Sequence, residues 1–282
     1  MSKASVIIAV LAIAATYGLI LYMVRQFIAL GFGEDWYLFS QTGWRLVRGQ
    51  PIYGAPIREV FYYYNPPWMT LLLLPLEVWP FEVSYALLIL VSLGLVLYLA
   101  QRLKLGLFAT LLTIVSPPVI LVLSHGQVDI LIVAGCLLAP NYLLPLVALT
   151  KPQAAILAIL SIPRERWKLA LVITLAGVAL SFVFFGFWPV AVASIPGPVM
   201  DLPRLIREGW LYKLVLCAVL VAIALRKKDN LLMLAASPLL SPYAHMFSFF
   251  GLSLCVARLK PLPATLLVVA WWTIYLYTPW FP

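Results

Sequence analysis

Apolar runs long enough to cross a membrane recur along the whole chain, and this feature constrains the fold more than any other. Hydrophobic residues make up 64% of the 282 positions and charged residues only 10%, against about 25% charged residues in soluble domains. So few polar residues cannot cover a soluble fold of this length. Residues 1–282 are therefore predicted to form a single, all-α, polytopic membrane domain.

The basic residues gather in short clusters between the apolar runs. The net charge of +9 is thus distributed as the positive-inside rule expects for cytoplasmic loops, and it does not favour a nucleic-acid partner. Lys3 precedes the apolar stretch Val6–Met23, which is too long for the core of a cleaved signal peptide. We predict a multi-pass protein of the cell (plasma) membrane with a cytoplasmic N-terminus. The clusters are Arg102/Lys104, Arg164/Arg166/Lys168, Arg226/Lys227/Lys228 and Arg258/Lys260.

With the N-terminus inside, residues 31–82 form a long extracytoplasmic loop. Its segment 33–49 has the spacing of an amphipathic helix that lies flat among lipid headgroups. The short apolar stretch 67–79 is predicted to be a second interfacial or re-entrant helix. The first helix would carry Trp36, Phe39, Trp44 and Val47 on one face and Gln41, Arg45 and Arg48 on another.

The remaining apolar runs predict further spans, for a total of about eleven membrane helices, some of them short or broken. Pro117-Pro118 should kink one span, and Lys151-Pro152 should divide another into two half-length helices that meet at Lys151. Half-helices are tolerated only where they line protein or a cavity. The predicted segments are 83–100, 107–123, 130–139, 142–162, 169–187, 211–225, 231–240, 246–257 and 262–278.

The acidic residues fall on the outer side of this topology, which was fixed from the basic clusters alone. Eight of the ten are predicted to be outside, and the spans carry almost no ionisable group, unlike those of an ion-coupled transporter. The pattern favours an enzyme whose site lies at the outer rim of a membrane scaffold. The eight are Glu34, Asp35, Glu59, Glu77, Glu82, Asp129, Asp201 and Glu208.

Two charged residues stand out as candidates for chemistry. Asp35 follows the first span, where it could take a proton from an acceptor hydroxyl or could simply cap the following helix. Lys151 lies within an apolar run and next to a proline. It could hold a phosphate oxygen, or its ammonium could snorkel to the interface. The broken helix favours the phosphate role.

Polar side chains in the turns between spans supply the other candidates. His125, Gln127 and Asp129 could bind sugar hydroxyls or a phosphate, or could form an ordinary polar hairpin. His245 and Tyr243 of the segment SPYAH occupy an outer helix break, where His245 could donate to a phosphate or cap a helix end. Tyr64 belongs to the run Tyr62-Tyr63-Tyr64-Asn65, which could stack on a sugar or form an aromatic belt. Arg45, Arg204 and Arg207 could meet a lipid phosphate or face headgroups.

No metal or other cofactor is predicted. Two possible ligands at His125 and Asp129, without a third, are weak evidence for a metal. Cys136, Cys217 and Cys255 all lie inside apolar runs without a CxxC motif, and they are predicted to be packing residues.

The order of these segments resembles the polyprenol-phosphate-dependent mannosyltransferases of glycosyltransferase family 87, in the GT-C class. The resemblance covers roughly residues 5–257, and it rests on the order of short motifs rather than on any one of them. After the acidic residue Asp35, the matching segments are GQPIY (49–53), YNPPW (64–68), PLEVWP (75–80), SPPVILVLSHGQVDIL (116–131), LTKPQ (149–153), RERW (164–167) and SPYAH (241–245).

This resemblance implies a GT-C fold and an inverting transfer of sugar outside the cytoplasm. The implied donor is a polyprenyl-monophosphate sugar, and the implied acceptor is a lipid or a glycan. By carry-over, Asp35 would be the base, Lys151 and His245 would contact the phosphate, and Gln127 would lie near the sugar. An inverting displacement needs a base on one face of the anomeric carbon and charge stabilisation on the other.

Two other classes of function remain open on sequence grounds. A transporter or flippase of lipid-linked sugars would need the same lipid groove and basic contacts, but it should tolerate Asp35→Asn. An accessory subunit of a larger membrane complex should expose apolar patches on its small outer loops.

Overall fold

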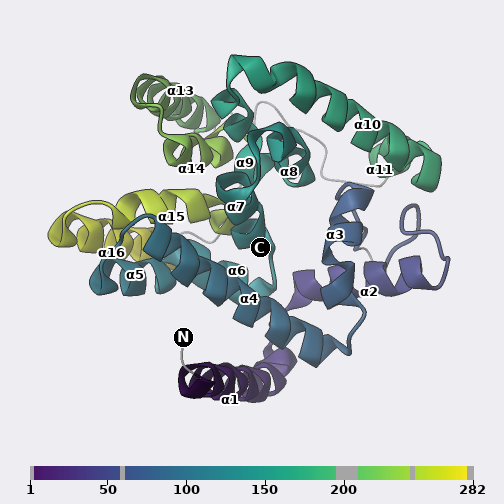
Figure 1. The fold of residues 1–282 in the computed structure, drawn as a ribbon, viewed down its shortest axis with the longest axis horizontal. Helices are drawn as coiled ribbons and strands as arrows, with labels where there is room; N and C mark the ends of the chain where they lie inside the picture. Colours follow the sequence, from purple (N-terminus) through teal and green to yellow (C-terminus); the bar gives the residue numbers. More distant parts are fainter. Residues whose placement is uncertain (1–2, 58–60, 195–208, 242–244, 278–282) are drawn as a thin grey trace.

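The computed structural model describes residues 3–57, 61–194, 209–241 and 245–277, and helices dominate these segments. Helical residues make up 81% of the structure, and no β-strand occurs in the described part. The all-helical architecture is therefore confirmed, and Figure 1 shows its arrangement. Glu59, Asp201 and Glu208, which were predicted to be outside, lie beyond the described residues.

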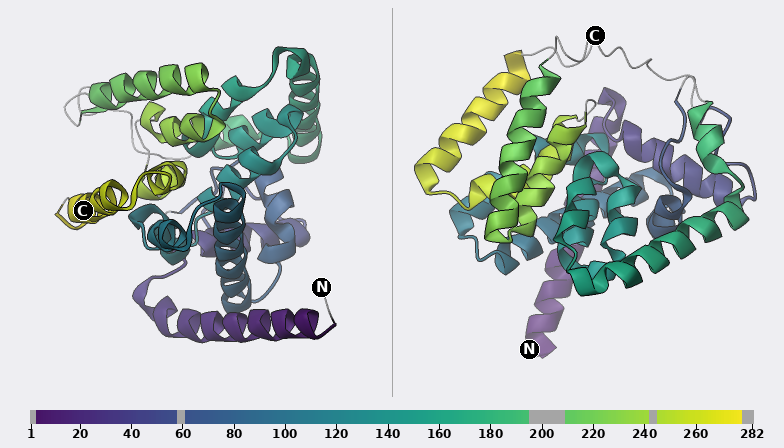
Figure 2. Two further views of the ribbon diagram at one scale, coloured as in Figure 1. Left: turned by 60° about the vertical axis from the view of Figure 1, so that its left-hand side comes forward. Right: turned by 90° about the horizontal axis from the view of Figure 1, so that it is seen from above.

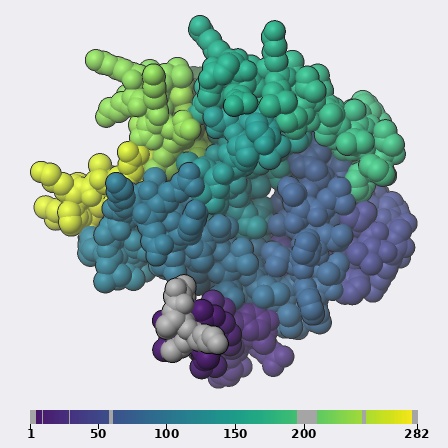
Figure 3. Space-filling model, viewed as in Figure 1, coloured from purple at the N-terminus to yellow at the C-terminus, as the bar shows by residue number. Residues whose placement is uncertain are grey.

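Within the described residues, three helices are long and apolar enough to cross a membrane. They are α1 (Lys3–Phe27), α4 (Phe81–Arg102) and the stretch Arg164–Phe185, which consists of η4 (Arg164–Arg166) and α10 (Trp167–Phe185). Only 6% of the apolar window of α1 is buried, and α1 lies at the edge of the molecule (Figure 3). Most of its surface is therefore free to face lipid.

A fourth candidate span is bent, as the proline pair predicted. Helices α5 (Leu107–Ile114) and α6 (Pro117–His125) meet at an angle of 50°. Pro117 and Pro118 occupy the first turn of α6, where a proline fits because its missing N–H has no partner in the helix. The break separates the two halves without removing an internal helix hydrogen bond.

The other apolar helices are shorter, so the total of about eleven membrane helices stays a prediction. The helix α13 reaches 18 residues but includes Lys213, Arg226 and Lys227. The right-hand view of Figure 2 shows the start of α1 and the end of α13 directed to the same side. The shorter elements are α7 (Asp129–Leu138), α8 (Leu144–Thr150), α9 (Pro152–Ala155), η3 (Ile156–Ser161), α11 (Trp188–Ala193), α13 (Trp210–Lys227), α14 (Asn230–Leu240), η5 (Met246–Phe249), α15 (Phe250–Ala257) and α16 (Pro261–Tyr277).

The helix pair that meets at Lys151 is confirmed. Helix α8 ends at Thr150, α9 begins at Pro152, and Lys151 between them has the non-helical angles φ −145° and ψ 80°. The residue before a proline is pushed out of the helical region by the proline ring. The local sequence therefore accounts for the break, which places Lys151 at the junction of two short helices.

The loop that was predicted to be extracytoplasmic contains the two expected helices, α2 (Glu34–Val47) and α3 (Pro67–Glu77). The predicted apolar face of α2 is only half right. Trp36 and Phe39 are buried, but Val47 is 54% exposed. The buried side of α2 packs on α3 and α4 rather than on lipid. It consists of Trp36, Phe39, Ser40, Thr42 and Gly43.

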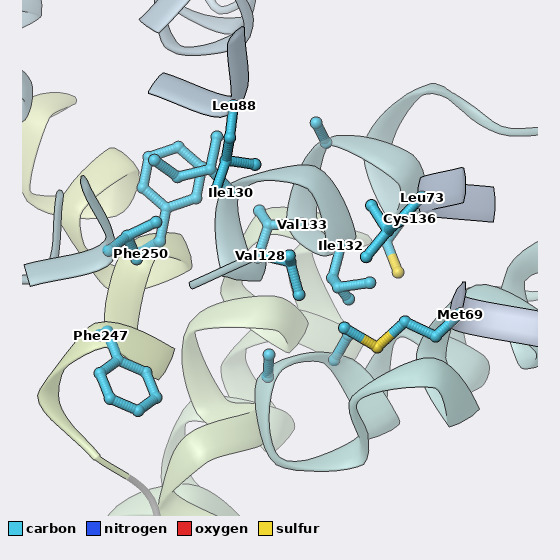
Figure 4. Packing of buried hydrophobic residues seen from close by; sticks show 14 of the residues in the cluster. Met69, Leu73, Leu88, Val128, Ile130, Ile132, Val133, Cys136, Phe247 and Phe250 are labelled. Atoms are coloured by element: carbon cyan, nitrogen blue, oxygen red, sulfur yellow. The ribbon is translucent and has the colours of Figure 1, made fainter. Parts of the chain in front are cut away.

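The core surrounds α7, which lies at the centre of the molecule (Figure 1). Figure 4 shows Ile130 beside Leu88 of α4, and Ile132 and Cys136 toward Met69 and Leu73 of α3. The helix is apolar on all sides, as expected for an element packed on every face. Cys136 and Cys217 are buried and Cys255 is half-buried, all as free thiols, which agrees with a packing role.

Candidate functional site

A cleft of about 550 Å³ brings together residues from four separate parts of the chain. They come from the start of α2, the segment 61–65, the turn between α6 and α7, and the region from Lys151 to η5. This volume lies within the range of small-ligand sites, about 300–1,000 Å³. The lining residues are Glu34, Asp35, Tyr37, Leu38, Phe39, Phe61, Tyr62, Tyr63, Tyr64, Asn65, His125, Gln127, Lys151, Gln153, His245 and Phe247.

Asp35 is the second residue of α2 and does not cap that helix. The N-cap is Gly33, which has φ 80° and provides no side-chain hydrogen bond. The Asp35 carboxylate instead accepts a hydrogen bond at 2.5 Å from Nε2 of Gln127. The helix-cap alternative for Asp35 is therefore wrong, and its side chain is directed to the cleft.

The turn between α6 and α7 is held tightly against α2 and α4. Gly126 ends α6 with φ +73°, and a Cβ atom there would collide with Trp36. The Tyr85 hydroxyl lies 2.6 Å from the carbonyl oxygen of Leu123 and 2.8 Å from that of Ser124. The amide of Gly33 donates to the same Ser124 oxygen at 2.8 Å. These contacts set Gln127 beside Asp35.

A polar chain runs through the floor of the cleft from Asp35 to Asp129. Gln127 donates to Asp35 and accepts a short hydrogen bond from Nζ of Lys151. Lys151 also forms an ion pair with Oδ2 of Asp129 at 2.5 Å. The second carboxylate oxygen of Asp129 is buried without a hydrogen-bond partner in the structure. The Lys151 ammonium is thus paired directly with the Asp129 carboxylate and linked to the Asp35 carboxylate through Gln127.

Lys151 is 4% exposed, so the snorkelling alternative is wrong. Its Nζ atom lies 4.8 Å from the centre of the Phe247 ring, a distance at which a cation is attracted by the ring face. Trp68 holds the end of α8 next to it, because the indole N–H donates to Oγ1 of Thr150 at 3.0 Å. Gln127, Asp129 and Phe247 thus contact the ammonium, while Trp68 fixes the end of the helix beside it.

The two histidines flank the same aromatic ring. Nδ1 of His125 lies 3.1 Å from both the carbonyl oxygen of Leu121 and the hydroxyl oxygen of Ser124, and its ring centre is 6.4 Å from that of Phe247. His245 stacks on Phe247 with ring centres 5.1 Å apart. Although His245 is exposed at the rim, surrounding protein excludes enough water to lower its pKa below 6.5, and the positive charge of Lys151 adds to this effect.

Burial raises the pKa of the Asp35 carboxyl above 3.8, against the opposing effects of the Gln127 hydrogen bond and of Lys151. A carboxylate that is partly removed from water is a stronger base than an ordinary aspartate. The opposing contacts stabilise its ionised form. Asp35 is therefore suited to accept a proton from a hydroxyl group in the cleft.

The other predicted site residues are distributed unevenly. Tyr64 lines the cleft and is 47% exposed, whereas Tyr63 is buried and accepts a hydrogen bond from Thr70. Arg45 lies elsewhere, since its guanidinium donates to the carbonyl oxygens of Ala55 and Pro56 at 3.2 and 2.7 Å. Tyr243, Arg204 and Arg207 lie outside the described residues.

Sequence reasoning missed several residues of the site. Phe247 and Gln153 line the cleft, yet an isolated phenylalanine in an apolar run gives no signal, and only the position of Gln153 beside the helix break could have suggested it. Glu34, which was not among the predicted site residues, also lines the cleft.

A further carboxyl group was missed behind the cleft. Glu77 is fully buried, and neither carboxyl oxygen has a hydrogen-bond partner in the structure. Burial raises the pKa of Glu77 to about 9, so the side chain is neutral at pH 7. Nothing in the sequence around it distinguishes this residue from a solvated acid.

The described residues contain no group of three or more His, Cys, Asp or Glu side chains that could hold a metal ion.

The chain matches no family model, no curated protein and no solved structure in the comparisons made with each. The fold and the site define only the class of protein, which is an all-helical protein with apolar helices long enough to span a membrane. Its distinguishing feature is a polar cleft with a carboxylate and a buried lysine.

Proposed function

We propose that this protein is a membrane glycosyltransferase of the GT-C type. It would transfer a sugar, a mannose-like hexose or a pentose, from a polyprenyl phosphate to a lipid or glycan acceptor, with inversion, on the extracytoplasmic side. The observation that carries the proposal is the pairing of Asp35 and Lys151 in one cleft, joined through Gln127. Base and cation are the two groups that this reaction needs.

In the proposed step, Asp35 takes the proton of an acceptor hydroxyl group. The acceptor oxygen attacks the anomeric carbon, and the bond from that carbon to the donor phosphate oxygen breaks on the opposite face. Polyprenyl phosphate departs with the electron pair, so the product has the inverted configuration. Lys151 and His245 stabilise the negative charge on the leaving phosphate, an electrostatic contribution of about 3–4 kcal/mol for one well-placed donor.

The rest of the cleft suits a sugar linked to a lipid. Tyr64 and Phe61 offer aromatic faces on which a sugar ring can stack, and both are about half exposed, at 47% and 48%. Gln153 and Asn65 provide amide groups for sugar hydroxyls. Leu71 and Leu72 of α3, the helix that follows the cleft residue Asn65, are 48% and 69% exposed, and a polyprenyl chain can lie along them in the membrane.

Sugar transfer by the purified protein tests the proposal. The protein is reconstituted in lipid with radiolabelled polyprenyl-phosphate sugars and a panel of lipid and glycan acceptors, and the labelled product is separated and counted. Wild type should form a glycosidic product, and Asp35→Asn should form it at least about 100-fold more slowly. Glu34→Gln should remain active, since Glu34 lines the same cleft but makes no contact in the polar chain.

The flippase alternative predicts a different result. Neither wild type nor Asp35→Asn would form product, and both would move the labelled lipid across the bilayer, which a membrane-impermeant reagent for the sugar can detect. That outcome would overturn the glycosyltransferase proposal.

A further inference from the structure

A second hollow, of about 410 Å³, lies at the opposite end of α4 from the cleft. It is formed where the loop between α4 and α5 meets the loop between α15 and α16, and Figure 1 shows these helix ends together. Apolar side chains such as Leu103, Phe108 and Leu112 form its wall. Two cationic residues, Lys104 and Arg258, line it as well.

The length of α4 separates this hollow from the cleft. Tyr37, which lines the cleft, contacts Phe81 at the first residue of α4, with ring centres 5.6 Å apart. Leu103, which lines the hollow, directly follows the last residue of the helix. A helix of 22 residues is about 33 Å long, close to the ~30 Å of a hydrocarbon core. The two sites therefore lie at opposite ends of a helix that is about as long as a hydrocarbon core is thick.

The charge around the hollow is positive. None of the described residues that line it is acidic, and Arg102 and Lys260 lie next to it in the chain. Arg258 donates to Oδ2 of Asp229 at 2.7 Å through one of its two terminal nitrogens, and its side chain remains 44% exposed. Lys104 is exposed as well.

We propose that this hollow binds the headgroup phosphate of an anionic phospholipid in the leaflet opposite the cleft. Basic residues at a membrane surface attract anionic lipid, and long side chains can lie along apolar surface while their charged ends contact the phosphate. The apolar wall formed by α5 and the beginning of α16 accommodates the first carbons of an acyl chain. The site is independent of the glycosyltransferase proposal.

Native mass spectrometry of the full-length protein tests this site. The protein is titrated with phosphatidylglycerol and with phosphatidylcholine of the same acyl chains. We expect a tightly retained phosphatidylglycerol in the wild type and about a five-fold weaker affinity in Lys104→Gln, since one basic contact contributes about 1 kcal/mol. Lys227→Gln removes an exposed basic residue that does not line the hollow, and its affinity should be unchanged.

A second variant distinguishes lipid binding in the hollow from lipid attraction by the general surface charge. Ala109→Phe fills the hollow while keeping every charge, and it should also release the lipid, with folding checked by size-exclusion chromatography. Competition with inorganic phosphate distinguishes a phosphate site from a lipid site, because free phosphate lacks the acyl contacts and should compete poorly. Equal retention of both lipids, or equal loss in Lys104→Gln and Lys227→Gln, would overturn the proposal.

Discussion

Lys151 is the residue on which the site depends. It would be unstable as an isolated charge in an apolar run, because a buried unpaired ion costs several kcal/mol. Asp129 and the side-chain oxygen of Gln127 compensate that charge. Gln127 also contacts Asp35, so the Asp35 carboxylate and the Lys151 ammonium are coupled through one amide. A change at any of these residues should therefore affect the others.

Removing the side-chain amide of Gln127 should shift the pH dependence of sugar transfer. In the proposed mechanism Asp35 is the base, so the rate should rise as the pH increases through its pKa, which burial already raises above 3.8. In Gln127→Met the ionised carboxylate loses a hydrogen bond of about 1.5–3 kcal/mol. Its pKa should then rise further, and the acidic limb of kcat/KM should move up by roughly one to two pH units.

Gln153→Met is the matched control for this pH profile. Gln153 lines the same cleft but makes no contact in the polar chain. The acidic limb of kcat/KM in Gln153→Met should therefore coincide with that of the wild type. An acidic limb that stays in place or moves down in Gln127→Met would show that Gln127 does not stabilise the carboxylate.

Breaking the ion pair should destabilise the protein more than removing both of its charges. Lys151→Met leaves Asp129 buried and unpaired, which should cost about 3–5 kcal/mol. Adding Asp129→Asn to this variant should restore much of the loss, although sugar transfer stays absent. Thermal unfolding in detergent measures both effects. If the double variant were no more stable than Lys151→Met, the two side chains would not be coupled in the folded protein.

The sequence was sufficient to find several of these residues but not their contacts. Lys151 was predicted because a charge inside an apolar run is costly unless it is paired. Asp35 and Gln127 were predicted because they follow or separate apolar spans. The direct pairing of Lys151 with Asp129 was not predicted, because it depends on how α7 packs against the break between α8 and α9. The fully buried Glu77 was missed for the same reason.

At the scale of elements, the contact between α2 and α3 positions Asp35. Gly43 lies where these helices cross, and a Cβ atom there would collide with the side chain of Glu77. Ser40 reinforces the contact by donating to the Glu77 carbonyl oxygen at 3.2 Å. The close approach of the helices keeps α2, and with it Asp35, in a fixed position over the cleft.

Gly43→Ala should therefore destabilise the protein, by about 1–3 kcal/mol, because the added methyl group has no space. Gly94→Ala in α4 is the matched control, since nothing lies within 4 Å of its added Cβ. It should be neutral or stabilising, by about 0.5–1 kcal/mol, as expected for alanine in a helix. Thermal unfolding of both variants tests this. Equal effects would show that α2 and α3 are not closely packed at Gly43.

Element boundaries were the more predictable part of the fold. Proline positions predicted both the bend between α5 and α6 and the break at Lys151, because a proline acts on its own neighbours. The face of α2 was harder to predict. Its aromatic residues suggested contact with lipid, whereas Trp36 donates to Oγ of Ser84 at 2.7 Å inside the protein. A helix covered by other helices and one covered by lipid have similar apolar patterns.

At the scale of the whole molecule, the basic clusters Arg102/Lys104 and Arg258/Lys260 lie at the opposite end of α4 from the cleft. Asp229 pairs with Arg258 beside the second hollow, a helix length away from Asp35. This separation agrees with the predicted topology, in which basic loops are cytoplasmic and the cleft is outside. Which side each end faces in the cell stays a prediction.

Cysteine labelling in intact cells tests this orientation. Tyr64→Cys and Lys260→Cys are each introduced after Cys136, Cys217 and Cys255 have been replaced by alanine. A membrane-impermeant maleimide should label Tyr64→Cys from outside, and it should label Lys260→Cys only after the cells are opened. Labelling of Lys260→Cys alone in intact cells would reverse the topology, and labelling of both would place the two ends on one side.

The most direct test of the catalytic role of Asp35 compares donor binding with single-turnover transfer in one preparation. With Asp35→Asn, the proposed mechanism predicts donor affinity within about two-fold of wild type and a transfer rate lower by about 10²–10⁴-fold, the usual contribution of a general base. A variant that transfers sugar at the wild-type rate would contradict the mechanism. So would one whose loss of transfer is fully explained by loss of donor binding.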